Sequence, residues 1–434
     1  MFLFVQGVLI LACIALIARI AEGSWLSPGA LFALLWSWYS LTALLFRVPS
    51  ETLILGIVWI AGSGVLMHLG CLWGTGSQRV ENQCEDKRFI YPYLRAVTGT
   101  LVFIGLVRIS YIILDGSPSL GEALSVENLS QIVMQNRATF VYGSEKLTFI
   151  ERVLFVAFYA APLFGGILFQ VAVSNMDKAI AVLAVIAPAA HNLLYGSRMG
   201  AMFGGAFWIS AYMAARLLGG RSGKAHSDVS NLRALICIAV AIVGTSLVVL
   251  SLRYGDEEVS TLSLLLLAAS DIFSFLPSFA ILLDKGTFSF SDLTYGDRTF
   301  GRIFEFARLG TEDHYIYEAV DVGYTSSNVY TVFQGLIDDF GHIGALVSAL
   351  IFGYIAGHSY HQVLRGKVVA VPFLTAVYAA VMISFSFSLF TYTSTTLALI
   401  SFGLYIVLMA KEVRPDSSLD SSRLRLSRHQ SQSQ

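Results

Sequence analysis

The sequence predicts an all-α fold: a polytopic membrane helix bundle of about eleven transmembrane helices (ten to twelve) with two long outward-facing loops. The mean hydropathy is +0.69, and only 13% of residues are charged while 56% are hydrophobic. A soluble globular chain carries about 25% charged residues. Several runs also reach the roughly 20 apolar residues that cross a bilayer. The chain is therefore expected to be an integral membrane protein.

Eleven apolar runs set the positions of the expected spans. The first lacks a basic n-region and a small-residue cleavage site, so it is predicted to be a span and not a signal peptide. A twelfth run, residues 261–283, is interrupted by Asp271 and Pro277 and is expected to lie at the membrane surface or to re-enter it. The spans are expected at residues 2–20, 26–46, 52–73, 96–114, 153–174, 178–194, 199–217, 234–252, 340–360, 369–388 and 391–410.

The distribution of basic residues predicts the orientation of these spans. Most of the 28 Lys and Arg residues fall in connections on one side of the expected membrane, which marks that side as cytoplasmic. The N-terminus then lies outside and the C-terminus inside. Residues 1–410 form the membrane-embedded unit, with residues 115–151 and 253–339 as the outward loops. The polar tail, 411–434, is expected to be a disordered cytoplasmic segment.

Sequence motifs for nucleotide or metal binding are missing. The chain has no GxxxxGK[ST], no HExxH, no CxxC and no D-x-D pair. The acidic GDEE stretch at 255–258 is a weak candidate for binding a metal ion and fits a solvated loop better. We therefore expect no cofactor, no metal ion and no nucleic-acid partner.

Arginines on the expected outer side carry the strongest chemical signal. Arg198 stands at the start of the seventh span, Arg137 lies in the first outward loop, and Arg253 follows the eighth span. Arg108 lies inside the fourth span, where a charge is costly and marks a functional candidate. A guanidinium binds phosphate oxygens through two parallel hydrogen bonds, so this set suits a diphosphate site. Arg198, Arg253 and Arg108 also suit anchors that reach lipid headgroups, and Arg137 also suits a solvated loop residue.

The larger outward loop supplies further candidates. His314 and Glu318 are four residues apart and would share a helix face, where either could accept a proton. Asp338 and Asp339 stand at the start of the ninth span, where acids also favour the positive end of a helix dipole. The other polar and aromatic candidates for binding a substrate are Tyr324, Asn328, Tyr330 and Thr331.

These motifs together resemble one family of membrane enzymes. The residues are GSR at 196–198, SSNVYT at 326–331 and DDFGHIG at 338–344. In this setting of spans and loops, they resemble the O-antigen polymerases of the Wzy type, the oligosaccharide repeat-unit polymerases of Gram-negative inner membranes. The motif-like part covers about 60 residues, while the similarity in topology covers most of the chain.

The resemblance implies a metal-independent glycosyltransferase on the periplasmic side of a bacterial inner membrane. Its donor and acceptor would be undecaprenyl-diphosphate-linked oligosaccharides, and a chain-length regulator in the same membrane is a further candidate partner. Within such a site, we expect Arg198, Arg137 and Arg253 to recognise the diphosphate, with Arg108 as a further substrate contact. Glu318 or His314 would activate the acceptor, and Asn328 and Asp339 would position the acceptor sugar.

Two other classes stay open. An O-antigen ligase shares the topology and chemistry, although Ser327 stands where ligases carry a histidine beside the Asn. A lipid-linked glycan flippase or another secondary transporter would need charges deep in several spans. Here only Arg108 and Asp271 are so placed, and polar residues gather in the outward loops.

Overall fold

The computed structural model describes residues 2–75, 91–114, 121, 125–142, 149–195, 198–218, 244, 248, 273–286, 293–306, 319–323, 326–327, 331–386 and 388–412. The helices are α1 (Phe2–Glu22), α2 (Pro28–Thr42), α3 (Ser50–Thr75), α4 (Tyr91–Leu114), α6 (Val126–Tyr142), α7 (Phe149–Val171), α8 (Asn175–Leu194), α9 (Arg198–Leu218), α12 (Phe275–Lys285), α13 (Asp297–Phe306), α14 (Val332–Leu364), α15 (Val371–Ile383) and α16 (Thr393–Glu412). Short 3-10 helices are η1 (Ala43–Leu45), η5 (Val368–Ala370) and η6 (Leu389–Thr391).

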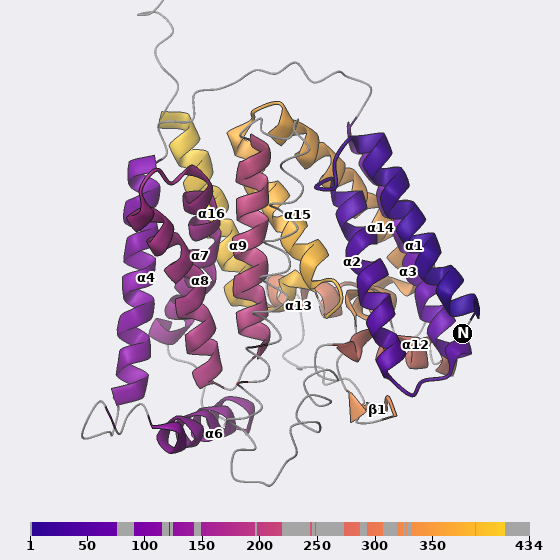
Figure 1. The fold of residues 1–434 in the computed structure, drawn as a ribbon, viewed down its shortest axis with the longest axis horizontal. Helices are drawn as coiled ribbons and strands as arrows, with labels where there is room; N and C mark the ends of the chain where they lie inside the picture. Colours follow the sequence, from indigo (N-terminus) through magenta and orange to yellow (C-terminus); the bar gives the residue numbers. More distant parts are fainter. Residues whose placement is uncertain are drawn as a thin grey trace, which may run out of the picture.

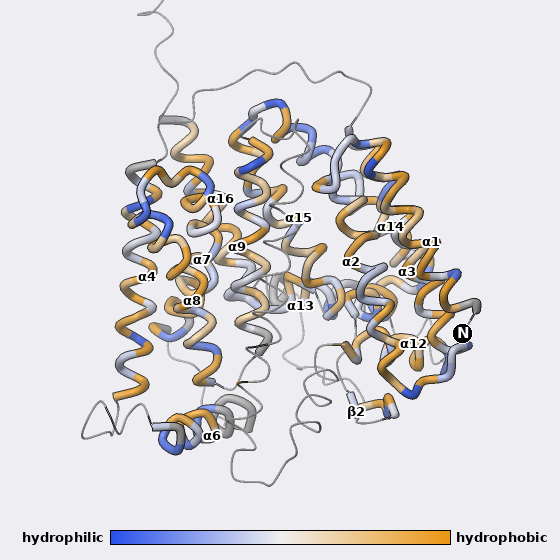
Figure 2. The backbone as a smooth tube through the Cα atoms, viewed as in Figure 1, coloured by the Kyte–Doolittle hydropathy of each residue, from blue (hydrophilic) through white to orange (hydrophobic). Residues whose placement is uncertain are grey.

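This architecture confirms the predicted all-α, polytopic membrane bundle. Within the described ranges, nine helices are long and apolar enough to cross a membrane, and a shorter apolar helical segment runs from Val368 to Ile383. Hydrophobic residues follow the helices and hydrophilic residues gather near their ends and in the connections (Figure 2). These ten segments match ten of the eleven expected spans. The expected span 234–252 lies outside the described residues apart from Gly244 and Val248, as do residues 413–434 of the expected tail.

The helices pack as two groups joined by α15. One group consists of α1, α2, α3, α12 and α14, and the other of α4, α7, α8, α9 and α16. Helix α15 lies between them, against α9 on one side and α2 and α14 on the other (Figure 1). Buried aromatic side chains fill the interior, among them Trp36, Phe203 and Tyr378.

Helices α3 and α14 approach each other at backbone distance. A Cβ atom at Gly353 or Gly357 of α14 would collide with the carbonyl oxygen of Met67 or Cys71 of α3. Gly70 and Gly74 of α3 face the α14 backbone in the same way. Small residues four apart are the usual way for membrane helices to pack this closely, so these glycines fix the contact that holds the first group together.

Two expected spans differ in length from the observed helices. Helix α14 starts at Val332 and not at 340, but Gly341 breaks it with φ 70° and ψ 174°. The part after this kink, residues 342–364, is long enough at about 1.5 Å per residue to cross a ~30 Å core. The expected span 369–388 was wrong in length, because α15 has only 13 residues and stops at Ile383. At about 20 Å, α15 is shorter than the membrane core.

The expected outward loops contain regular structure. Residues 115–151 include α6, and residues 253–339 include α12, α13 and a two-stranded antiparallel pair, β1 (Val320–Asp321) and β2 (Ser326–Ser327). Helix α6 and the strand pair lie at the same end of the bundle (Figure 1). We call this the α6 end. It is the end that the basic-residue distribution predicts to face outward.

Candidate functional site

Arg108 links three helices at the α6 end. Its guanidinium donates to the Glu151 carboxylate of α7, with the atoms 3.4 Å apart, and to the hydroxyl oxygen of Tyr195, at 3.3 Å. The guanidinium carbon also lies 5.6 Å from the centre of the Tyr111 ring. The side chain is 21% exposed, so it is neither buried in the bundle nor free in solution. The Arg108 guanidinium is therefore held by a carboxylate and two aromatic side chains.

A buried histidine, His191, packs against the Tyr195 ring. His191 of α8 stacks on Phe158 with ring centres 4.0 Å apart, and its ring lies 4.9 Å from that of Tyr195. Phe155 contacts both His191 and Tyr195 edge to face. Sequence reasoning missed His191 and Tyr195, because their spacing in α8 shows no motif and their partners come from α4 and α7.

Helix α6 docks beside the turn that precedes α9. The amide nitrogen of Asn136 donates to the backbone oxygen of Leu194, at 3.1 Å. Arg137 is the next residue of α6, and Arg198 begins α9 four residues after Leu194. The backbone positions of these two arginines are thus brought to the same end of the bundle as Arg108. Gly200 of α9 lets α8 and α9 approach closely at this end, because a Cβ atom there would collide with the Asn192 side chain of α8.

A second polar cluster joins the start of α13 to the first turns of α14. The Asp339 carboxylate is fully buried and accepts three hydrogen bonds. The donors are the Thr294 hydroxyl at 2.5 Å and the backbone N–H groups of Arg298 at 2.8 Å and Thr299 at 2.7 Å. Asp339 therefore caps the N-terminus of α13, where the helix dipole and unpaired N–H groups favour an anion.

The neighbouring acid, Asp338, keeps part of its surface. Its carboxylate is 22% exposed and lies 4.0 Å from the Arg298 guanidinium nitrogen. It also accepts a hydrogen bond from the Gln334 amide at 2.6 Å. The backbone oxygens of Asp338 and Asp339 accept from the N–H groups of Thr294 and Tyr295, so the turn 294–297 is held against α14. Of the two adjacent acids, Asp339 is fully buried and Asp338 keeps a partly exposed carboxylate.

A hydroxyl-rich connection contacts both α9 and α13. Residues 384–396 read SFSFSLFTYTSTT and contain η6 and the start of α16. Tyr392 packs on Phe203 of α9 with ring centres 5.9 Å apart, and Phe390 packs on Phe300 of α13 at 5.7 Å. Phe203 is five residues from Arg198, and Phe300 is two residues from Arg298. One short segment therefore contacts both the helix that starts at Arg198 and the helix that carries Arg298.

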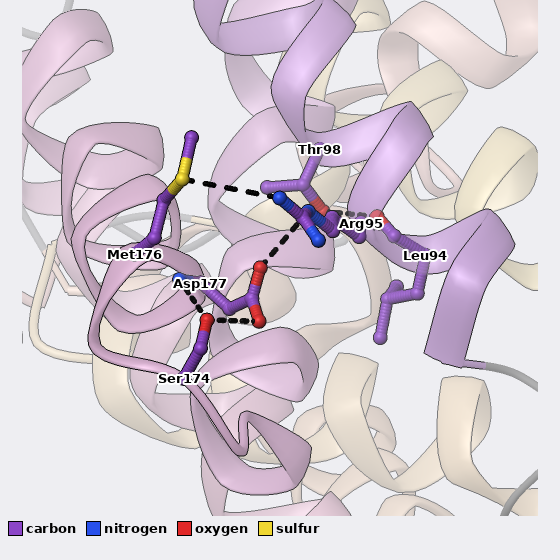
Figure 3. Close-up of polar contacts among 6 residues, drawn as sticks. All are labelled: Leu94, Arg95, Thr98, Ser174, Met176 and Asp177. Atoms are coloured by element: carbon purple, nitrogen blue, oxygen red, sulfur yellow. Dashed lines mark hydrogen bonds and ion pairs between the residues drawn. The ribbon is translucent and has the colours of Figure 1, made fainter.

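The opposite end of the bundle carries an ion pair of a different kind. Arg95 of α4 lies 3.0 Å from the carboxylate of Asp177 in α8. Asp177 is buried, and its backbone N–H donates to the Ser174 hydroxyl that caps α8 (Figure 3). Both partners are positioned by the first turns of their helices, and Met176 and Thr98 surround them. This ion pair links α4 to α8, so Arg95 and Asp177 have a structural role.

The structure describes some of the predicted site residues with their side chains, some as backbone only, and others not at all. Arg108, Thr331 and Asp339 are described with their side chains, and Arg137 and Arg198 as helical backbone. Thr331 precedes α14 and is buried. Arg253, His314, Glu318, Tyr324, Asn328 and Tyr330 lie outside the described residues. Among the described residues, no group of three His, Cys, Asp or Glu side chains could hold a metal ion.

Comparisons with known proteins add no relative. No family model, no curated protein and no solved structure matches the chain.

Proposed function

We propose that this chain polymerises lipid-linked O-antigen repeat units at the periplasmic face of a bacterial inner membrane. It would act as a metal-independent glycosyltransferase, with undecaprenyl-diphosphate-linked oligosaccharides as donor and acceptor and a chain-length regulator as a partner in the membrane. The observation that supports this most is the gathering of arginine-bearing elements at the α6 end. Arg108 lies at the rim with its charge partly exposed, and α6 and the start of α9 meet beside it.

The proposed chemistry uses these cations in place of a metal ion. The bond between the donor's anomeric carbon and the diphosphate oxygen breaks, and the electron pair leaves with the diphosphate. Fixed positive charges stabilise that departing anion more strongly at a partly desolvated rim than in water. The membrane would place the polyprenyl chain beside the helices and the diphosphate near their ends, and Arg108 lies six residues before the end of α4.

Arg198→Ala is expected to abolish long glycan chains while the protein still inserts in the membrane. Removal of one charge that stabilises a transition state lowers turnover by about 10²–10³-fold. The measurement is complementation of a cell from which the gene is deleted, read as the length of lipopolysaccharide chains on a gel. The matched control is Arg216→Ala at the other end of α9, where the guanidinium donates to the Tyr212 hydroxyl.

The same assay separates the competing classes. Loss of long chains with single repeat units retained on the lipid core supports a polymerase. Loss of all attached units indicates a ligase or a flippase. Long chains of normal length in the Arg198→Ala strain would remove this arginine from the site.

Glu151→Gln is expected to strengthen binding of the lipid diphosphate. The carboxylate of Glu151 competes with a diphosphate for the Arg108 guanidinium, because the two groups lie 3.4 Å apart. A partly exposed ion pair contributes about 1 kcal/mol or less to stability, so the variant should fold normally. The apparent KM for the donor should fall several-fold. A KM that equals the wild-type value would place the diphosphate away from Arg108.

A further inference from the structure

We propose that the cluster formed by Tyr295, Arg298, Gln334 and Asp338 binds the acceptor sugar, and that Asp338 takes the proton from its attacking hydroxyl group. This inference deepens the proposed polymerase function and rests on it. None of these four residues was singled out for this role by the sequence motifs, which favoured Asp339, His314 and Glu318.

Burial separates the roles of the two adjacent acids. Asp339 is fully buried, and its carboxylate already accepts from Thr294 and from the first turn of α13. Asp338 accepts a hydrogen bond from the Gln334 amide, and its side chain remains 22% exposed. A general base must come within hydrogen-bond distance of the proton that it accepts. Of these two acids, only Asp338 offers a carboxylate surface to an incoming hydroxyl.

Tyr295 presents an exposed aromatic side chain on the turn that is bonded to the backbone of this part of α14. The residue has a φ of 49°, a conformation that is a genuine outlier for a bulky side chain. Its backbone N–H is fixed by the Asp339 carbonyl oxygen at 3.1 Å, and the residue is 73% exposed. An exposed aromatic ring held by a rigid turn can stack against the apolar face of a sugar. The ligand class that fits an aromatic ring, a carboxylate, an amide and a guanidinium together is therefore a carbohydrate.

The position of the cluster suits an acceptor site. It lies at one side of the hydroxyl-rich connection 384–396, and the helix that begins at Arg198 lies at the other side. The exposed residues Tyr392 and Thr393 belong to this connection. A donor diphosphate at the arginines and an acceptor sugar at Asp338 would thus meet over one short segment of the chain.

The proposed step balances in atoms and charge. The acceptor hydroxyl oxygen bonds to the donor's anomeric carbon, and its proton moves to the Asp338 carboxylate. The bond from that carbon to the diphosphate oxygen breaks, and the diphosphate leaves with the electron pair. Asp338 returns the proton to water. The Arg298 guanidinium lies 4.0 Å from this carboxylate.

The test measures acceptor kinetics with purified full-length protein. The donor is the undecaprenyl-diphosphate-linked repeat unit at a fixed concentration, and the acceptor is the same repeat unit as an alkyl glycoside, which can accept but cannot donate. Asp338→Asn should lower kcat by about 10²–10⁴-fold with an acceptor KM near the wild-type value. Asp338→Glu should retain more activity than Asp338→Asn.

The aromatic residue should affect binding and not turnover. Tyr295→Ala should raise the acceptor KM by about 3- to 10-fold, as expected for one lost ring contact, and leave kcat near the wild-type value. The control is Tyr93→Ala, which removes an aromatic side chain that is 57% exposed near the start of α4, at the opposite end of the bundle.

The outcomes distinguish failure of the acceptor site from failure of the polymerase proposal. Wild-type turnover in Asp338→Asn, or an unchanged acceptor KM in Tyr295→Ala, overturns the acceptor site and leaves the polymerase proposal standing. If the Asn variant does not fold, Asp338→Glu decides: reduced kcat at a wild-type melting temperature supports the site, and wild-type kcat overturns it. A wild-type protein that transfers no repeat unit overturns the proposed function itself.

Discussion

Gly353→Ala is expected to destabilise the protein by more than about 3 kcal/mol. The added methyl group would collide with the backbone oxygen of Met67 in α3. Inserting a methyl group into a packed site commonly costs about 1–3 kcal/mol. The cost here should exceed that range because the obstacle is backbone, which cannot rotate away. The two helices would have to separate, and their separation would disturb the first helix group.

The matched control for this variant is Gly62→Ala. Gly62 lies in the same helix as Met67, and a Cβ atom there would meet nothing within 4 Å. Alanine also favours helix over glycine by about 1 kcal/mol, so the control should be as stable as the wild type or slightly more stable. Thermal unfolding in detergent measures both. Equal melting temperatures for the two variants would show that α3 and α14 do not touch at Gly353.

Asp339→Ala is expected to destabilise the protein by about 3–5 kcal/mol, the usual cost of removing one partner from a buried charged network. The substitution removes the acceptor of the Thr294 hydroxyl and leaves the N–H groups of Arg298 and Thr299 buried at the start of α13 without a partner. The turn before α13 would keep its backbone hydrogen bonds to α14 but lose these three side-chain ones.

The adjacent residue provides the control for this second prediction. Asp338→Ala removes a carboxylate that is 22% exposed, and a partly exposed ion pair contributes about 1 kcal/mol or less. Unfolding monitored by intrinsic fluorescence in detergent compares the two. A larger loss of stability in Asp338→Ala than in Asp339→Ala would contradict the burial of Asp339.

Hydropathy predicted most of the fold, because a helix in lipid needs a long run of apolar side chains and a connection in water does not. Ten of the expected spans appear as apolar helical segments, and the expected start of the ninth at residue 340 lies next to the Gly341 kink. Hydropathy failed at the end of the tenth expected span, because α15 stops at Ile383. The next residue bonds back to the helix: the Ser384 hydroxyl donates to the Val381 carbonyl oxygen.

The candidate site was less predictable than the fold. Arg108 could be singled out because a charge inside an apolar run is visible in the sequence. The role of Asp339 could not, because its donors lie about 40 residues earlier in the chain and meet it only through tertiary packing. His191 and Tyr195 were missed for the same reason, since their ring partners come from other helices.

The central claim is that guanidinium groups at the α6 end, with no metal ion, hold a lipid diphosphate during glycan transfer. The most direct measurement is polymerisation by the purified protein in liposomes, with undecaprenyl-diphosphate-linked repeat units as the only substrate and a chelator present. The account predicts a ladder of long glycans from the wild type, with no effect of the chelator, and none from Arg198→Ala. A ladder that disappears with the chelator, or that persists in Arg198→Ala, would contradict it.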